Sequence, residues 1–226
     1  MGRRKLIDWN YELKERLMLF SLAKDGDTFF DIGANEGLYS IPFARRFSGS
    51  RVYAFEPIPQ IRERLNENIR MDGKLKNIFV FPCGLSDKQG LVDFYFSPSD
   101  PGATSMAPLE ERFGATVRIR TSVTTIDELS DLHPVPNIIK CDVEGAELLV
   151  LKGGAETIAK HHPIIQCEML RKWAKRFDYH PNDIIAFLKQ FGYQCFSLRD
   201  SKLERFETMT EETTETNFYF LPRSLA

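Results

Sequence analysis

The sequence predicts an α/β protein with one doubly wound sheet, mostly parallel, whose last strand is antiparallel. Three observations support this fold class. Short apolar segments alternate with segments of helical periodicity along most of the chain. A glycine turn follows the first apolar segment, and two further apolar segments close the sequence as a pair. At 226 residues and 42% hydrophobic content, the chain suits a single domain over residues 1–226.

The first half of the chain supplies three strands and their helices. Residues 1–26 form a lead with a helix over about 10–23, whose apolar residues include Leu13, Leu17 and Phe20. Pro42 should kink or delay the helix after the first strand, because it removes a backbone hydrogen bond. A further helix over about 59–71 stops at Gly73. The strands are expected at Thr28–Ile32, Arg51–Phe55 and Ile78–Phe81.

The second half departs from this alternation before returning to it. Residues 88–123 are expected to be an insertion with two extra strands and a turn-rich loop near a substrate. Thr125 and Glu128 form a capping box that begins a short helix. Helices are then expected up to about residue 160 and over about 182–191. The strands are expected at Gly90–Phe96, Thr116–Val123, Asn137–Cys141, Ile164–Glu168, Cys195–Leu198 and Phe218–Leu221.

The turn after the first strand predicts a nucleoside site. Gly33 and Gly37 permit sharp backbone geometry at the point where a strand leads into a helix. Glu56 ends the next strand 23 residues after Gly33, near the ~20-residue offset at which an acid reaches a ribose hydroxyl. The middle glycine of a dinucleotide turn is missing, and Glu36 and Asp31 would repel phosphates.

A cofactor with an adenosine, no phosphate and a cationic end fits these residues best, and S-adenosylmethionine is such a cofactor. Asp31 is then expected to face its ammonium or sulfonium end, and Glu56 its ribose. A nicotinamide dinucleotide, and with it an oxidoreductase, is disfavoured by the glycine spacing.

A second group of acids follows the fourth and fifth parallel strands. Asp142, Glu144 and Glu147 come just after residues 137–141, and Glu168 ends the next strand. The carboxyl ends of parallel strands share one edge of the sheet, so these acids should meet the reactive end of the cofactor. Alternatively, Glu144 and Glu147 only open a helix, where the helix dipole favours acids.

Crowded carboxylates raise one another's pKa, and a carboxylate with a raised pKa can take a proton from a hydroxyl. Asp142, Glu144 and Glu168 are therefore the candidate catalytic residues. Asp142 and Glu168 could also gather a divalent cation through their oxygens. Because the sequence offers no evident third ligand, no metal site is predicted.

Four strings in order resemble the FkbM family of S-adenosylmethionine-dependent methyltransferases. They are Asp31-Ile-Gly-Ala-Asn-Glu-Gly37, Phe55-Glu56-Pro57, Leu85-Ser86-Asp87 and Lys140-Cys-Asp-Val-Glu-Gly-Ala-Glu147. The resemblance implies a Rossmann-like sheet of the class I methyltransferase type. It also implies O-methylation of hydroxyls on sugars, glycans or natural products. The cofactor contacts that it implies are Asp31, Gly33, Asn35, Gly37, Glu56 and Asp142, with Cys83, Gly84 and Leu85 against the adenine.

Two other functions stay open: an RNA or protein N-methyltransferase, and a non-catalytic nucleoside-binding module. The net charge of −2 and pI near 6.1 argue against general nucleic-acid affinity. No apolar run is long enough to cross a membrane. The four cysteines are spread singly and are expected to be buried thiols in a reducing, cytoplasmic protein. The acceptor and the oligomeric state are not specified by the sequence.

Overall fold

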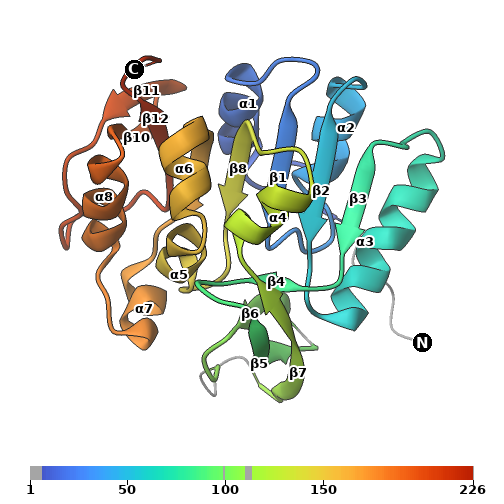
Figure 1. Cartoon of the computed structure of the whole chain (residues 1–226). Coiled ribbons are helices and arrows are strands. Elements are labelled where there is room, and N and C mark those ends of the chain that lie inside the picture. The colour runs from blue at the N-terminus through green and yellow to red at the C-terminus, as the bar shows by residue number, and fades with distance from the viewer. Residues whose placement is uncertain (1–6, 99, 110–113, 226) are drawn as a thin grey trace.

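The computed structural model describes residues 7–98, 100–109 and 114–225 (Figure 1). Parts of the expected lead (1–6) and of the expected insertion (99 and 110–113) lie outside these ranges. Within them, eight strands form the main sheet in the order β11-β10-β12-β9-β8-β1-β2-β3. Their bounds are β1 (Thr28–Ile32), β2 (Arg51–Phe55), β3 (Ile78–Phe81), β8 (Ile138–Cys141), β9 (Ile164–Glu168), β10 (Tyr193–Arg199), β11 (Lys202–Arg205) and β12 (Asn217–Pro222).

The strand pairing confirms the predicted fold class. Strands β3, β2, β1, β8 and β9 pair in parallel, and β12 pairs antiparallel with both β9 and β10. The strand order reverses at the β1–β8 pair, so that the turns after these two strands lie on either side of the switch point. Strand β11 is a further antiparallel strand that the sequence did not predict.

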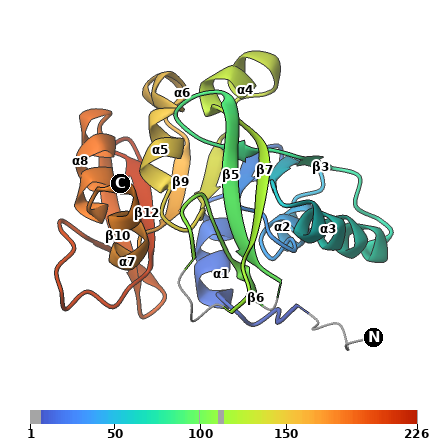
Figure 2. The same cartoon turned by 90° about the horizontal axis from the view of Figure 1, so that it is seen from below.

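Helices cover both faces of the main sheet, as Figures 1 and 2 show. One face carries α1 (Leu13–Ser21), α2 (Ser40–Arg46) and α3 (Pro59–Asp72). The other face carries α4 (Ile126–Leu132), α5 (Glu147–Lys152), α6 (Ala155–His161) and α8 (Pro181–Gln190). The short α7 (Arg171–Ala174) and the 3-10 turn η2 (Lys175–Phe177) follow β9.

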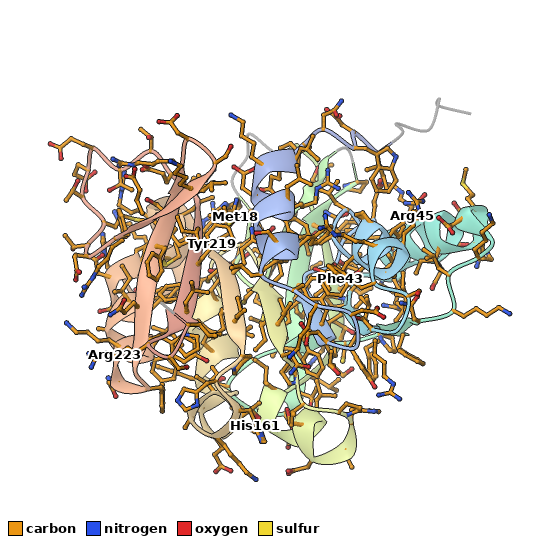
Figure 3. All side chains as sticks on the ribbon, turned by 90° about the horizontal axis from the view of Figure 1, so that it is seen from above. Met18, Phe43, Arg45, His161, Tyr219 and Arg223 are labelled. Carbon is orange, nitrogen blue, oxygen red and sulfur yellow. The ribbon has the colours of Figure 1, made fainter. Side chains whose placement is uncertain are left out.

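Strand β1 contributes side chains to both faces of the main sheet, because successive side chains of a strand point in opposite directions. Phe29 packs with the α1 and α2 side chains, its ring 4.5 Å from that of Phe43. Phe30 and Ile32 join the larger cluster on the opposite face. Figure 3 shows Phe43 on α2, and Tyr219 of β12 under α1. All five residues of this strand are buried, and its three apolar residues, Phe29, Phe30 and Ile32, serve both faces.

A second, smaller sheet lies beyond the carboxyl ends of the main strands (Figure 1). Its order is β4-β7-β5-β6, with β4 (Gly84–Leu85), β5 (Gly90–Ser97), β6 (Asp100–Ser105) and β7 (Val117–Thr124). Strands β5 and β7 are the two that the sequence predicted in the insertion, and β4 and β6 are additional. Phe94, Phe96 and Val123 pack this sheet on Ile58 and Ile61 beside α3.

Three helices can be compared with what the sequence predicted for them. Helix α2 begins only at Ser40, so Pro42 falls in its first turn, where its missing N–H would have no helical partner. The helix expected to reach residue 160 is instead two helices that meet at Gly153-Gly154. A Cβ at Gly153 would lie 2.0 Å from the Ser86 carbonyl oxygen, so the glycine lets the backbone that follows β4 pass close by.

The expected apolar face of the first helix is also wrong in part. Leu13 and Leu17 are 39% and 50% exposed, whereas Leu19, Phe20 and the cation Arg16 are buried. No helix in the described ranges is long and apolar enough to cross a bilayer. All four cysteines are free thiols; Cys141, Cys167 and Cys195 are buried as the sequence predicted, whereas Cys83 is only half-buried.

Candidate functional site

A cavity of about 1010 Å³ lies where the carboxyl ends of the main strands face the small sheet. Segments far apart in the sequence form its wall: residues 7–12, the turn after β1, the ends of β2, β8 and β9, and β4 with the β5–β6 connection. Of the predicted site residues, those that line the cavity are Gly33, Asn35, Glu56, Gly84, Leu85, Asp142, Glu144 and Glu168.

The turn after β1 has the sharp geometry that its glycines predicted. Gly33 has φ +79°, and its N–H donates to the Phe55 carbonyl at 3.1 Å. A Cβ on Gly33 would lie 1.9 Å from the Asp142 carbonyl oxygen. At Gly37, with φ +96°, a Cβ would lie 2.7 Å from Leu65. Both glycines are therefore required by the protein's own packing at the switch point, before any ligand is considered.

Glu56 is held at the end of β2 by two backbone donors. Its Oε2 accepts from the Asn35 N–H at 3.0 Å and its Oε1 from the Ile58 N–H at 2.9 Å. The residue is 3% exposed, and burial raises the pKa of its carboxyl to about 7. Each carboxylate oxygen can accept a further hydrogen bond, so Glu56 can receive the two hydroxyls of a ribose from the cavity.

Asp31 does not line the cavity. It is fully buried, and its Oδ2 accepts from the Ser40 hydroxyl at 2.5 Å. The Lys140 Nζ lies 3.9 Å from the Asp31 Oδ1, 3.2 Å from the Asp142 Oδ2 and 3.3 Å from the Gly33 carbonyl oxygen. Burial lowers the pKa of Lys140, but Asp142 and Asp31 more than offset this, so the net shift is upward.

Lys140 is a residue to which the sequence analysis gave no role. The signal was present: a charged side chain stands inside the apolar β8 strand, and a buried charge needs partners. The sequence analysis also gave no site role to Tyr11, Glu12 and Tyr39, which line the cavity. No pattern in the sequence links these positions to the glycine turn, because they come together only in the folded chain.

Gly37 and Cys83 also lie outside the cavity wall. Burial raises the pKa of the Cys83 thiol to about 11, which disfavours a reactive thiolate. A direct cofactor contact by these two residues or by Asp31 stays a prediction. The structure instead gives Asp31 and Gly37 supporting positions behind the β1 turn.

The acids after β8 and β9 come together as predicted. One carboxylate oxygen from each of Asp142, Glu144 and Glu168 lies within 4.8 Å of the others. Burial, then Asp142, raises the pKa of Glu144 to about 9 and that of Glu168 to about 11. Asp142 forms an ion pair with Lys140. Glu144 and Glu168 therefore hold a proton more strongly than an exposed glutamate does, and either of them is a stronger base when it is ionised.

Glu144 and Glu147 have separate tasks, which the sequence could not distinguish. Glu144 has φ +55° and lines the cavity, and its carbonyl accepts from the Ser105 hydroxyl at 2.9 Å. Glu147 is buried behind the loop, where its Oε1 accepts from the Val143 and Gly145 N–H groups at 3.0 and 3.1 Å. Glu147 therefore shapes the loop that presents Glu144 to the cavity.

The spacing of Asp142, Glu144 and Glu168 also bears on metal binding. Three carboxylate oxygens within 4.8 Å could hold a hard divalent cation such as Mg²⁺. No metal was expected because the sequence offered only two possible ligands, Asp142 and Glu168, and the structure supplies Glu144 as a third. The absence of a metal requirement stays a prediction.

Comparison with solved structures identifies the class of fold. A methyltransferase FkbM from Methylobacillus flagellatus superimposes with a TM-score of 0.57 at 20% identity, covering 88% of this chain and 44% of that one. A SAM-dependent O-methyltransferase from Thermotoga maritima superimposes with a TM-score of 0.51 at 12% identity, covering 98% and 68%. The fold is therefore the Rossmann-like fold of S-adenosylmethionine-dependent methyltransferases, with the cavity at its switch point.

The profile described as "Methyltransferase FkbM domain" matches residues 31–195, and the chain belongs to this family. Methyltransferase sdnD of Sordaria araneosa is 29% identical over 171 residues, 63% of this chain and 65% of that protein. Hexuronic acid methyltransferase AglP of Haloferax volcanii is 32% identical, covering 60% and 53%. The 2-O-methyltransferase NoeI of Sinorhizobium fredii is 29% identical, covering 64% of each. The chain thus spans about half to two thirds of these relatives.

Proposed function

We propose that this protein binds S-adenosylmethionine in the cavity and transfers its methyl group to a hydroxyl of a sugar, a glycan or a natural product. One observation carries the proposal: a single cavity joins the Gly33 turn and Glu56 to the group of Asp142, Glu144 and Glu168. The Gly33 turn and Glu56 suit an adenosine, and the group of three acids suits a reacting centre that loses positive charge and a proton.

The residues present fit the nucleoside part of the cofactor. Glu56 has acceptor capacity for two ribose hydroxyls while both its oxygens are fixed by backbone N–H groups. Gly84 and Leu85 form the cavity wall on the side of the small sheet, where the family resemblance puts the adenine. This arrangement sets the opposite end of the cofactor toward the β8 and β9 carboxyl ends.

The bound cofactor supplies the methyl group from a sulfonium ion. The protein's own part is to hold the acceptor hydroxyl near Glu144 and Glu168 and to receive its proton. Because burial and mutual repulsion raise their pKa values, either carboxylate is a stronger base when ionised than an exposed glutamate. Lys140 keeps Asp142 paired, so the proton goes to one of the two glutamates.

A hydroxylated small acceptor is supported over a nucleic acid by the charge of the cavity wall. Its acids are Asp8, Glu12, Glu36, Glu56, Glu63, Glu67, Asp142, Glu144 and Glu168, and its bases are Arg64 and Lys140. Such a wall would repel a phosphate backbone. The names of the hexuronic acid methyltransferase and the 2-O-methyltransferase agree with a sugar hydroxyl as acceptor.

The test has two stages. Calorimetric titration should show binding of S-adenosylmethionine and S-adenosylhomocysteine but not of NAD. In Glu56→Ala, with the fold intact by circular dichroism, nucleoside binding should be lost. Transfer of a radiolabelled methyl group to a panel of uronic acids, neutral sugars and polyketide alcohols then identifies the acceptor. Binding without transfer to any hydroxyl, together with transfer to an RNA or a protein amine, would contradict the proposal.

A further inference from the structure

The N-terminal segment 7–12 lies outside the matched family region, yet it contributes Ile7, Asp8, Tyr11 and Glu12 to the cavity wall. A place in the cavity wall is unexpected for a lead segment, and the question is which part of a bound ligand the segment contacts. The acid that the sequence assigned to the cationic end of the cofactor, Asp31, is fully buried beside Ser40 and Lys140 and does not reach the cavity.

Glu12 reaches the cavity, whereas Asp31 does not. Its Oε2 accepts from the Tyr39 hydroxyl at 3.1 Å and its Oε1 from the Asn217 amide at 3.1 Å. Each of these oxygens can accept a second hydrogen bond. Glu12 is half-buried in the wall of the cavity, so the remaining lone pairs are available to a ligand.

The donors to Glu12 are themselves fixed by a buried amide. The Gln166 Nε2 donates to the Tyr39 hydroxyl oxygen at 3.0 Å and to the Asn217 Oδ1 at 2.9 Å. Tyr39 and Asn217 must therefore turn their own hydrogens toward Glu12. Gln166 is fully buried on β9, and Asn217 opens β12, so two strands of the main sheet orient one side chain from the lead segment.

The backbone at Glu12 shows that this placement overrides local preference. Glu12 is the N-cap of α1, and its side chain makes no capping hydrogen bond to the helix. Its φ is +49°, a left-handed conformation that a glutamate adopts at a cost. Buried Arg16 secures the turn by donating to the Trp9 and Leu38 carbonyls.

The charges around Glu12 favour a cation beside it. Glu12 and Asp142 both line the cavity, and the negative charge of Asp142 is the strongest electrostatic influence on Glu12. Burial and Asp142 raise the pKa of the Glu12 carboxyl, while Lys140, Asn217 and Tyr39 lower it, and the net shift is upward. Both carboxylates line the same cavity, and the ammonium of Lys140 beside them is buried. A second ammonium placed between the two carboxylates would stabilise both of them.

We infer that Glu12, together with Asp142, binds the α-ammonium group of the methionine part of S-adenosylmethionine. This inference rests on the proposed function, because it assigns one end of the cofactor within the same cavity. It makes the lead segment part of the cofactor site, and it gives a reason for the left-handed backbone at Glu12.

The test compares nucleosides that differ only at the amino acid end. S-Adenosylhomocysteine carries the ammonium and the carboxylate, its decarboxylated analogue carries the ammonium alone, and 5′-methylthioadenosine carries neither. Glu12→Gln, which is nearly isosteric, should weaken binding of the first two by ~10- to 100-fold, as expected for loss of a charged hydrogen-bonding partner. Its affinity for 5′-methylthioadenosine should equal that of the wild type. Glu15→Gln, one turn further along α1, is the matched control and should change no affinity.

Each other outcome overturns the inference. Equal weakening of all three nucleosides would show that Glu12 only supports the wall. Unchanged affinity for S-adenosylhomocysteine would show that the ammonium lies elsewhere, and weakening of S-adenosylhomocysteine without its decarboxylated analogue would assign Glu12 to the carboxylate end. If the wild type binds none of the nucleosides, the proposed function itself fails.

Discussion

The Lys140 ammonium lies 3.2 Å from the Asp142 carboxylate, and the same ammonium donates to the Gly33 carbonyl at 3.3 Å. A single buried side chain therefore links the glycine turn of β1 to the acids after β8. This link matters because the turn belongs to the proposed cofactor site, whereas the acids belong to the proposed transfer site. The two parts of the cavity are held in one geometry by this one charge.

Removing this charge should destabilise the fold. In Lys140→Met, Asp31 and Asp142 lose the cation that they share, and Asp31 stays fully buried without that charged partner. Breaking a buried ion pair on one side typically costs about 3–5 kcal/mol of unfolding free energy. Urea denaturation measures this loss. Lys152→Met, at an exposed position of α5, is the control and should change little; equal stability of the two variants would contradict the role given to Lys140.

A methyl group at Gly33 should be far more harmful than one at Gly73. Both glycines have positive φ, +79° and +69°, so each alanine variant incurs a left-handed conformational cost of about 1–2 kcal/mol. Gly73 has no atom within 4 Å of the added Cβ, whereas Gly33 has the Asp142 carbonyl oxygen at 1.9 Å. Gly33→Ala should therefore lose at least about 2 kcal/mol more. Thermal melts of the two variants compare them directly, and similar melting temperatures would refute the contact.

Glu147 should make stability depend on pH. Burial raises the pKa of its carboxyl from 4.5 to about 7, so between these values the folded state binds more protons than the unfolded chain. The contribution of Glu147 to the unfolding free energy therefore falls as pH rises through this window and is lost above it. The stability of Glu147→Gln relative to that of the wild type should therefore be about 3 kcal/mol greater at pH 8 than at pH 4.5.

Urea titrations of both proteins at several pH values measure this difference. Glu156→Gln is the matched control at an exposed position of α6, and its curve should run parallel to that of the wild type. A Glu147→Gln curve that also stays parallel would mean that the Glu147 carboxyl is already ionised at low pH in the folded protein.

Loss of the proton acceptor should reduce turnover without loss of cofactor binding. Glu168→Gln and Glu144→Gln keep the shape of the transfer site but remove one carboxylate each. The variant that loses the base should transfer methyl groups ~10²–10⁴-fold more slowly, while its affinity for S-adenosylhomocysteine is maintained. Single-turnover kinetics with the acceptor identified above measures the step. Full activity in both variants would exclude a glutamate base.

Much of this architecture could be predicted from the sequence because its signals are local. The β1 strand is apolar except for Thr28 and Asp31, and the glycines that follow it mark a sharp turn that other residues adopt only at a cost. Carboxyl ends of parallel strands must share an edge, so Glu56, Asp142 and Glu168 could be assigned to one site from their positions after predicted strands.

The features that the sequence did not predict also have specific physical causes. The break at Gly153 depends on the Ser86 backbone, which approaches from another part of the chain. Leu13 and Leu17 follow helical spacing, but the helix turns Leu19 and Phe20 inward because those side chains fit the surface around Phe29 and Tyr219. Periodicity identifies a helix, but it does not specify which face of the helix packs against the rest of the protein.

The sequence by itself determined the order of strands and helices, the conformation of the glycine turn and the edge of the sheet at which the acids gather, because backbone preference and apolar patterning act over a few residues. Only the tertiary structure decided which acids reach the cavity. Asp31 is withdrawn behind Lys140, and Glu12 is brought in by Tyr39 and Asn217. The physical reason is that a carboxylate's position and proton affinity depend on the donors, charges and burial that distant segments impose on it.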